Sequence, residues 1–215
     1  MIFGKKILNL PVCLITMVLL GSPASATPES ICLPNHSSVQ DSNKSWTIDR
    51  LMKQLPQRLH YEEPFRETYT STMLTQASVK KGTLRFTPPS KLEKHVLSPF
   101  EEIFIAEGET LRYVNPEQNI STTFAMQDIP SLSAFILGLR TLFTGNVSHL
   151  RQHFHLTLIG TDSSWNLNLR PVTRSEFNTL ECIEILGTNN RIRAIKVKEV
   201  NGDHSELLLS PSEGE

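Results

Sequence analysis

The segment from Gly82 to Asn115 constrains the fold more than any other part of the chain, because apolar and polar residues nearly alternate along it. Turn residues such as Pro88-Pro89 and Glu107-Gly108 divide it into pieces of β-strand length. A period of two places the apolar side chains on one face of an antiparallel sheet. That face needs a cover, which is a helix, a second sheet or a ligand. The alternating apolar residues are Leu84, Phe86, Leu92, Val96, Ile103, Ile105, Leu111 and Tyr113.

Strand-like patterns also flank this segment on both sides. They are rich in aromatic, β-branched and threonine residues, and short turn sequences separate most of them. Short connections imply that consecutive strands pair as antiparallel neighbours. The additional predicted strands are 61–75, 120–124, 154–161, 165–171, 180–186, 191–200 and 206–209.

Helical spacing occurs in three places. Residues 48–55 form a short amphipathic pattern, and residues 146–153 form another. Between them, Asp128 is the expected cap of a helix with Pro130 in its first turn, and Gly145 ends that helix. The apolar residues of this central helix recur at spacings of three and four; they are Leu132, Phe135, Ile136, Leu139, Leu142 and Phe143.

The order of these elements is a helix, many strands, a helical insert and more strands. This order predicts an α+β fold in which one large curved antiparallel sheet carries helices on one side. We expect a single domain over residues 46–210 and a short tail over residues 211–215, since the chain of 215 residues is long enough for one sizeable core.

The N-terminal region has the pattern of an export signal. Lys5 and Lys6 precede an apolar run, and Ala24-Ser25-Ala26 resembles a cleavage site. We therefore predict a signal peptide over residues 1–26, a polar flexible leader over residues 27–45, and an exported protein, most simply periplasmic. The alternative is an uncleaved anchor.

Cysteine usage leaves two interpretations open. Cys13 lies in the predicted signal peptide, so Cys32 and Cys182 remain in the exported chain. An oxidising compartment permits one disulfide between them, which would join the leader to a late strand. Alternatively, both cysteines are unpaired.

Composition and motifs argue against several classes of function. The formal net charge is −1, and no basic stripe with interleaved aromatic residues indicates nucleic-acid binding. His149 and His153 lie four residues apart, but no H-E-x-x-H motif accompanies them, so solvent-facing histidines are expected rather than a metal site. No nucleophile elbow, phosphate loop or dinucleotide fingerprint is present, so we expect neither an enzyme nor a cofactor.

The order and spacing of the motifs resemble the LolA-like periplasmic carriers of outer-membrane lipoproteins. The resemblance covers residues 46 to about 209. It begins with Gly82-x-Leu84-x-Phe86-x-x-Pro89-x-x-Leu92 and continues with Gly108-x-x-Leu111-x-Tyr113. The central helical insert, Trp165-x-Leu167-x-Leu169-x-Pro171 and the closing strand pair complete it.

Such a resemblance implies a half-open β-barrel whose helices form a lid over an apolar concave face. Lipoprotein acyl chains would occupy the cavity, arriving from an inner-membrane exporter and leaving to an outer-membrane acceptor, and the carrier would be a monomer. The expected cavity-lining residues are Leu84, Phe86, Leu92, Val96, Ile103, Ile105, Trp165, Leu167 and Leu169, and the lid residues are the six of the central helix. The alternative is that both sets are ordinary core.

The sequence departs from the carriers at several positions, among them Leu92 and Lys94, where the family has strand aromatics. An arginine that usually precedes the motif proline and latches the lid is replaced here by Pro88. The chain therefore also resembles the branch that accompanies aryl-polyene and other lipid-export gene sets, whose cargo would be another amphiphile such as a glycolipid. A non-carrying envelope interaction domain and, less favoured, a lipid-modifying enzyme are the remaining hypotheses.

Overall fold

The computed structural model describes residues 32, 46–55, 61–173, 175 and 177–210. The predicted signal peptide, the predicted tail and all of the predicted leader except Cys32 lie outside the described residues. Among the described residues, no helix combines the length and the apolar character needed to cross a membrane.

The strands and helices follow the chain in the predicted order. Helix α1 (Ile48–Gln54) begins at Thr47, whose side chain accepts a hydrogen bond from the Arg50 amide. The central helices are α2 (Pro130–Thr144) and α3 (Val147–His153), preceded by the 3-10 turn η2 (Met126–Asp128). The strands are β1 (Tyr61–Thr70), β2 (Ser78–Thr87), β3 (Lys91–Ser98), β4 (Glu102–Glu107), β5 (Thr110–Asn115), β6 (Ile120–Ala125), β7 (Phe154–Gly160), β8 (Trp165–Pro171), β9 (Leu180–Thr188), β10 (Arg191–Glu199) and β11 (His204–Leu209).

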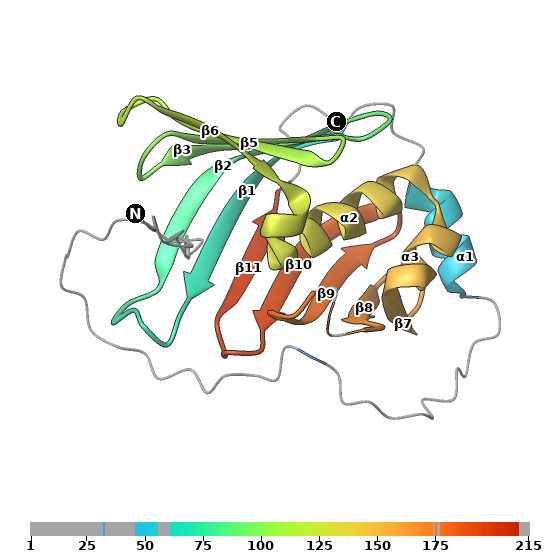
Figure 1. The fold of residues 1–215 in the computed structure, drawn as a ribbon. Helices are drawn as coiled ribbons and strands as arrows, with labels where there is room; N and C mark the ends of the chain where they lie inside the picture. Colours follow the sequence, from blue (N-terminus) through green and yellow to red (C-terminus); the bar gives the residue numbers. More distant parts are fainter. Residues whose placement is uncertain (1–31, 33–45, 56–60, 174, 176, 211–215) are drawn as a thin grey trace.

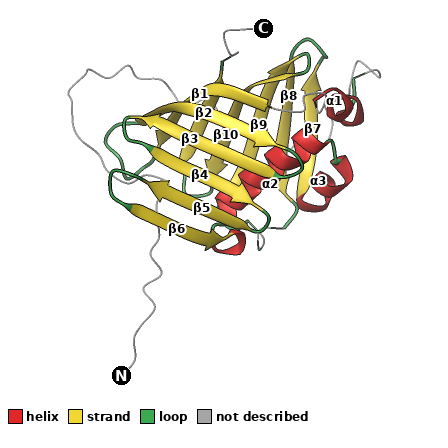
Figure 2. Ribbon diagram, turned by 90° about the horizontal axis from the view of Figure 1, so that it is seen from above, coloured by secondary structure: helices red, strands yellow, loops and turns green. Residues whose placement is uncertain are grey.

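All of these strands join one antiparallel sheet. Its order is β6-β5-β4-β3-β2-β1-β11-β10-β9-β8-β7, so the described sheet is open, with β6 and β7 at its edges. Every neighbouring pair is consecutive in the sequence except β1 and β11, which join the two halves of the chain, with Phe65 opposite Leu209. Figures 1 and 2 show the sheet curving around α2. The predicted α+β class and open curved sheet are confirmed.

Helix α2 forms where its periodic apolar residues predict it, but its cap differs from the prediction. Gly145 ends the helix in the left-handed conformation, with φ of 69°, which glycine adopts without steric cost. Asp128 is not the N-cap; it belongs to η2, and Ile129 occupies the cap position without a side-chain hydrogen bond. Pro130 at the first turn needs no amide partner, so the helix starts without the predicted polar cap.

Gly82 sits where β2 and β3 change register. The pairing shifts between Lys81 and Gly82, which marks a β-bulge or similar irregularity. A Cβ at Gly82 would lie 1.9 Å from the carbonyl oxygen of His95 on β3. The first residue of the Gly82-x-Leu84-x-Phe86 motif is therefore a glycine because the neighbouring backbone leaves no room for a side chain.

Candidate functional site

The candidate site is the layer between the concave face of the sheet and α2. Seven of the nine predicted lining residues point into this layer and are buried. Leu84, Val96, Leu167 and Leu169 are 0% exposed, and Phe86, Leu92 and Trp165 are at most 4% exposed. All seven belong to one hydrophobic core.

Ile103 and Ile105 are placed differently from the prediction. On β4, Ala106 pairs with the inward-facing Leu92, so Ala106, Phe104 and Glu102 face the concave side. Ile103 and Ile105 alternate with these residues and therefore face the opposite side of the sheet, half-buried. The expectation that they share a face with Leu92 is wrong. Phe104, on the concave side, takes their place against the core.

The six predicted lid residues all pack in or against the same core. Ile136, Leu139 and Leu142 are at most 3% exposed, while Leu132, Phe135 and Phe143 are half-buried. The ring of Phe143 lies 4.6 Å from that of Tyr61 and 4.8 Å from that of Phe86. These contacts join the end of α2 to β1 and β2.

Gly138 faces the sheet on the other side of α2. A Cβ at this position would lie 3.6 Å from Leu169 and 3.9 Å from Ile183. In this conformation the apolar layer is therefore filled by the protein's own side chains. An acyl chain reaches Leu84, Phe86 or Leu169 only if α2 moves away from the sheet.

Side-chain hydrogen bonds of Arg140 and Ser131 join α2 to more distant elements. Arg140 donates from Nη1 to the carbonyl oxygen of Gly108, in the turn between β4 and β5, over 2.8 Å. Ser131 hydrogen-bonds to Thr179, in the loop before β9. Much of the remaining described contact between α2 and the sheet is apolar. Helix α2 can therefore separate from the sheet without breaking many hydrogen bonds.

A second, charged region occupies the same concave face. Lys94 pairs with Glu67 at 2.6 Å, and its Nζ lies 5.3 Å from the ring centre of Phe65. Lys80 pairs with Glu102, which also accepts a hydrogen bond from the hydroxyl of Tyr113. All four charged side chains are less than a fifth exposed. The sequence analysis missed this region because charged residues are normally solvated, and only their alternation with apolar neighbours marks them as inward-facing.

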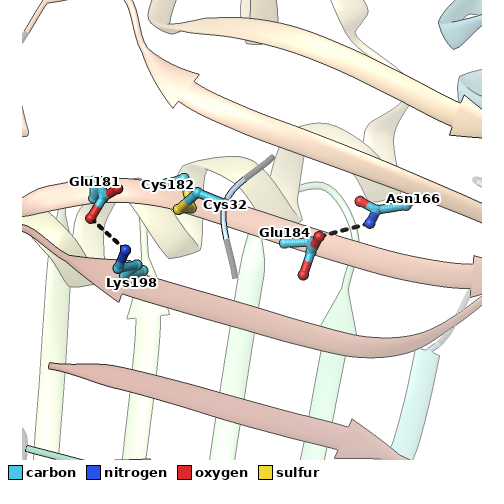
Figure 3. Close-up of a disulfide and its surroundings, with 6 residues drawn as sticks. All are labelled: Cys32, Asn166, Glu181, Cys182, Glu184 and Lys198. Atoms are coloured by element: carbon cyan, nitrogen blue, oxygen red, sulfur yellow. Dashed lines mark hydrogen bonds and ion pairs between the residues drawn. A yellow bond between two sulfur atoms is a disulfide. The ribbon is translucent and has the colours of Figure 1, made fainter. Parts of the chain in front are cut away.

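The opposite face of the sheet carries the disulfide. Cys182 alternates with the inward-facing Ile183 on β9, so it faces away from α2. It is bonded to Cys32, with the Cα atoms 6.2 Å apart (Figure 3). Nearby on β8 and β9, Asn166 donates to Glu184 over 2.7 Å. The disulfide therefore anchors Cys32 to the sheet without touching the apolar layer.

Within the described residues, the remaining polar side chains include no metal-binding cluster. The rings of His149 and His153 lie 5.0 Å apart, but no group of three His, Cys, Asp or Glu residues is arranged to hold a metal ion there. A polar pocket of about 240 Å³ is lined by Gln54, Asp162, Asn189 and Asn190.

Comparison with known proteins gives one family match. Residues 40–214 match the family described as "Outer membrane lipoprotein carrier protein LolA-like". No curated protein matches the sequence.

Solved structures with a similar arrangement are distant in sequence. The LolA superfamily protein NE2245 from Nitrosomonas europaea is 9% identical, with 78% of this chain and 93% of that chain covered and a TM-score of 0.40. An uncharacterised conserved protein from Thermus thermophilus is 10% identical, with 75% and 81% covered and a TM-score of 0.43. A DUF1329 family protein from Desulfovibrio piger is 6% identical, with 76% and 88% covered and a TM-score of 0.42.

Proposed function

The chain belongs to the LolA-like family of outer membrane lipoprotein carrier proteins, and we propose that it is a periplasmic carrier of lipoprotein acyl chains. The family is a non-enzymatic carrier and binding fold. In this proposal the acyl chains lie between α2 and the concave face while they travel from the inner to the outer membrane. An inner-membrane exporter loads the carrier, and an outer-membrane acceptor unloads it.

The observation that carries the proposal is the apolar packing of α2 on the sheet. Each methylene removed from water contributes about 0.8 kcal/mol, so acyl chains need an apolar cover to cross an aqueous compartment. The seven buried lining residues and the apolar stripe of α2 provide two such surfaces that face each other. When a lipid lies between the two surfaces, its acyl chains replace their contacts with each other, so both surfaces remain shielded from water.

A second candidate is a carrier of another amphiphile, such as an aryl-polyene or a glycolipid. The charged region beside the apolar layer favours it. Lys94 and Glu67 are inward-facing and mostly buried, so part of the concave face is polar. A polar region next to an apolar one suits a cargo with a head group as well as a tail.

A third candidate is an envelope interaction domain that carries nothing. The filled apolar layer favours it, because a permanently closed helix would make the layer an ordinary core. Movement of α2 therefore separates this candidate from the two carriers.

Locking α2 to the sheet tests the proposal. Ser131 and Thr179 touch through their side-chain hydroxyls, so cysteines at both positions are close enough to form a disulfide. We expect the oxidised Ser131→Cys/Thr179→Cys protein to bind the uncharged fluorophore N-phenyl-1-naphthylamine at least about tenfold more weakly than wild type. Reduction should restore binding.

The control is the Ser131→Cys single variant under both redox conditions, together with reduced wild type, since reduction also opens the Cys32–Cys182 bond. Peptide mapping verifies which cysteines are joined. Equal probe binding by the locked and reduced forms would show that α2 does not admit the ligand. Absence of probe binding by wild type would favour the interaction domain.

A further inference from the structure

Arg140 is the single charged residue in α2, whose sequence is otherwise apolar, small or hydroxylated. It follows Ile136 by four residues and precedes Phe143 by three, so the three side chains share one side of the helix. Ile136 and Phe143 belong to the apolar layer or pack against it. The stem of Arg140 therefore lies at the margin of the layer that is proposed to take acyl chains.

The guanidinium of Arg140 is anchored through one nitrogen. Nη1 donates to the carbonyl oxygen of Gly108 over 2.8 Å, and this contact holds the planar group against the turn between β4 and β5. The opposite edge of the guanidinium plane, which carries the Nε and Nη2 hydrogens, takes no part in this hydrogen bond. These two N–H bonds point in parallel and match the two oxygens of a carboxylate or a phosphate.

Both of these nitrogens are buried. In the part of the chain that the structure describes, neither Nε nor Nη2 has a hydrogen-bond partner. A buried donor without an acceptor is costly, and most costly when the donor is charged. These two donors therefore need an acceptor that the described residues do not supply.

Arg140 is ionised at neutral pH, because a guanidinium holds its proton well above that pH. Burial, the largest effect, lowers the pKa of Arg140, whereas Glu109 and Glu107 raise it. Both carboxylates are exposed to solvent on either side of Gly108. Water and salt screen their repulsion of an incoming anion, while the Nε and Nη2 atoms of Arg140 are buried.

We propose that Arg140 binds the oxoanion of an anionic amphiphile, a carboxylate or a phosphate, whose acyl tail lies under α2. The proposal rests on the proposed function, since Arg140 is reached by the same movement of α2 that opens the apolar layer. It narrows the cargo to lipids with an acidic head next to the tail. The second carrier candidate is then favoured over a lipoprotein whose acyl chains adjoin a neutral anchor.

Three competitors with one oleoyl tail each test this assignment by displacement of N-phenyl-1-naphthylamine. They are oleate, 1-oleoyl-glycerol-3-phosphate and the neutral 1-oleoyl-glycerol, so only the head group differs. We expect wild type to bind at least one anionic competitor about tenfold to hundredfold more tightly than the neutral one. A preference for oleate identifies a carboxylate, and a preference for the phosphate identifies a phospholipid-like head.

Substitution of Arg140 should remove this preference, measured in each variant as the ratio of its affinities for the anionic and the neutral competitor, because loss of the hydrogen bond to Gly108 also frees α2 and changes the affinity for both. Arg140→Met removes the charge and both donors but keeps an apolar stem, while Arg140→Lys keeps the charge without the parallel pair. We expect the preference to vanish in Arg140→Met and to be intermediate in Arg140→Lys. Arg112→Met, on the exposed side of β5, is the matched control and should keep the wild-type preference.

The outcomes separate the two proposals. Equal affinity of wild type for the charged and neutral competitors overturns the role of Arg140, while binding of all three supports an acyl-chain carrier. The role of Arg140 is also overturned if the Arg140→Met protein, shown by circular dichroism to be folded, still prefers the anionic competitors. Failure of wild type to bind 1-oleoyl-glycerol and the fluorophore overturns the carrier function itself, and with it the head-group site.

Discussion

Phe143 of α2 stacks on Phe86 of β2, with ring centroids 4.8 Å apart and an interplanar angle of 22°. Phe86 is 2% exposed, whereas Phe143 is half-buried at the end of the helix. The pair therefore joins a fixed side chain of the sheet to a side chain that would move with α2. An offset aromatic pair also contributes more than its buried area alone.

Phe143→Ala should lower stability and ease the movement of α2. We expect the free energy of unfolding to fall by about 2–3 kcal/mol, somewhat less than for a fully buried phenylalanine. Urea denaturation measures this loss, and stopped-flow fluorescence measures the uptake of N-phenyl-1-naphthylamine, which should be faster. Phe100→Ala, at an exposed turn, should change neither quantity. Unchanged uptake in a destabilised Phe143→Ala protein would show that α2 does not control entry.

Gly138→Ala should stabilise α2. The added methyl group meets Leu169 and Ile183 at ordinary contact distances of 3.6 and 3.9 Å, and alanine is favoured over glycine in a helix by about 1 kcal/mol. For a domain of this size the melting temperature should rise by about 2–4 °C. Gly82→Ala is the contrasting variant and should be destabilising, because its methyl group would overlap the His95 carbonyl. A lower melting temperature for Gly138→Ala would mean that α2 lies closer to the sheet than described.

The fold was predictable because its signals are local. Alternation and turn residues placed most strands within a few residues of their observed bounds, although the strand expected over residues 61–75 ends at Thr70. Short connections predicted the antiparallel order. Pairing of β1 with β11 could not be predicted this way, because it joins opposite ends of the chain and depends on the closing of the whole sheet.

The candidate site was predictable only in part. The direction of Ile103 and Ile105 was assigned wrongly because apolar residues occupy both faces of β4, so that alternation does not decide which face is inward. Pairing of Ala106 with Leu92 decides it instead. The inward-facing Lys94 and Glu67 were missed because each is buried only in the presence of the other.

Loss of the disulfide should destabilise the protein. Cys32 and Cys182 close a loop with a sequence separation of 150, and such a bond restricts the unfolded chain. We expect Cys32→Ala to lower the free energy of unfolding by about 2–5 kcal/mol, measured in urea. Because Cys182 faces away from α2, binding of N-phenyl-1-naphthylamine by the folded variant should be unchanged. Dithiothreitol should destabilise wild type to a similar degree and leave Cys32→Ala unaffected. If dithiothreitol also lowers the free energy of unfolding of Cys32→Ala, the destabilisation by this reagent does not come from the Cys32–Cys182 bond.

Asp203 should contribute stability that is lost in acid. It accepts hydrogen bonds from the Tyr69 hydroxyl at 3.0 Å and the Thr72 amide at 3.1 Å, and so ties the turn before β11 to the end of β1. Burial raises the pKa of Asp203, but hydrogen bonds from Ser71, Thr72, Tyr69 and Asn201 together lower it below the ordinary value of 3.8.

A lowered pKa in the folded state means that the unfolded chain binds the proton more readily, so the contribution is present above pH 3.8 and disappears as the pH falls through the folded value. Asp203→Asn should therefore be less stable than wild type at neutral pH, by about 1–3 kcal/mol, and the gap should narrow below about pH 4. Urea denaturation midpoints of both proteins from pH 7 to pH 3 measure this stability difference. Tyr69→Phe removes one hydrogen-bond donor to Asp203. Its stability difference from wild type should therefore narrow less at low pH than that of Asp203→Asn. A gap that stays constant down to pH 3 would mean that the charge of Asp203 does not stabilise the joined turns.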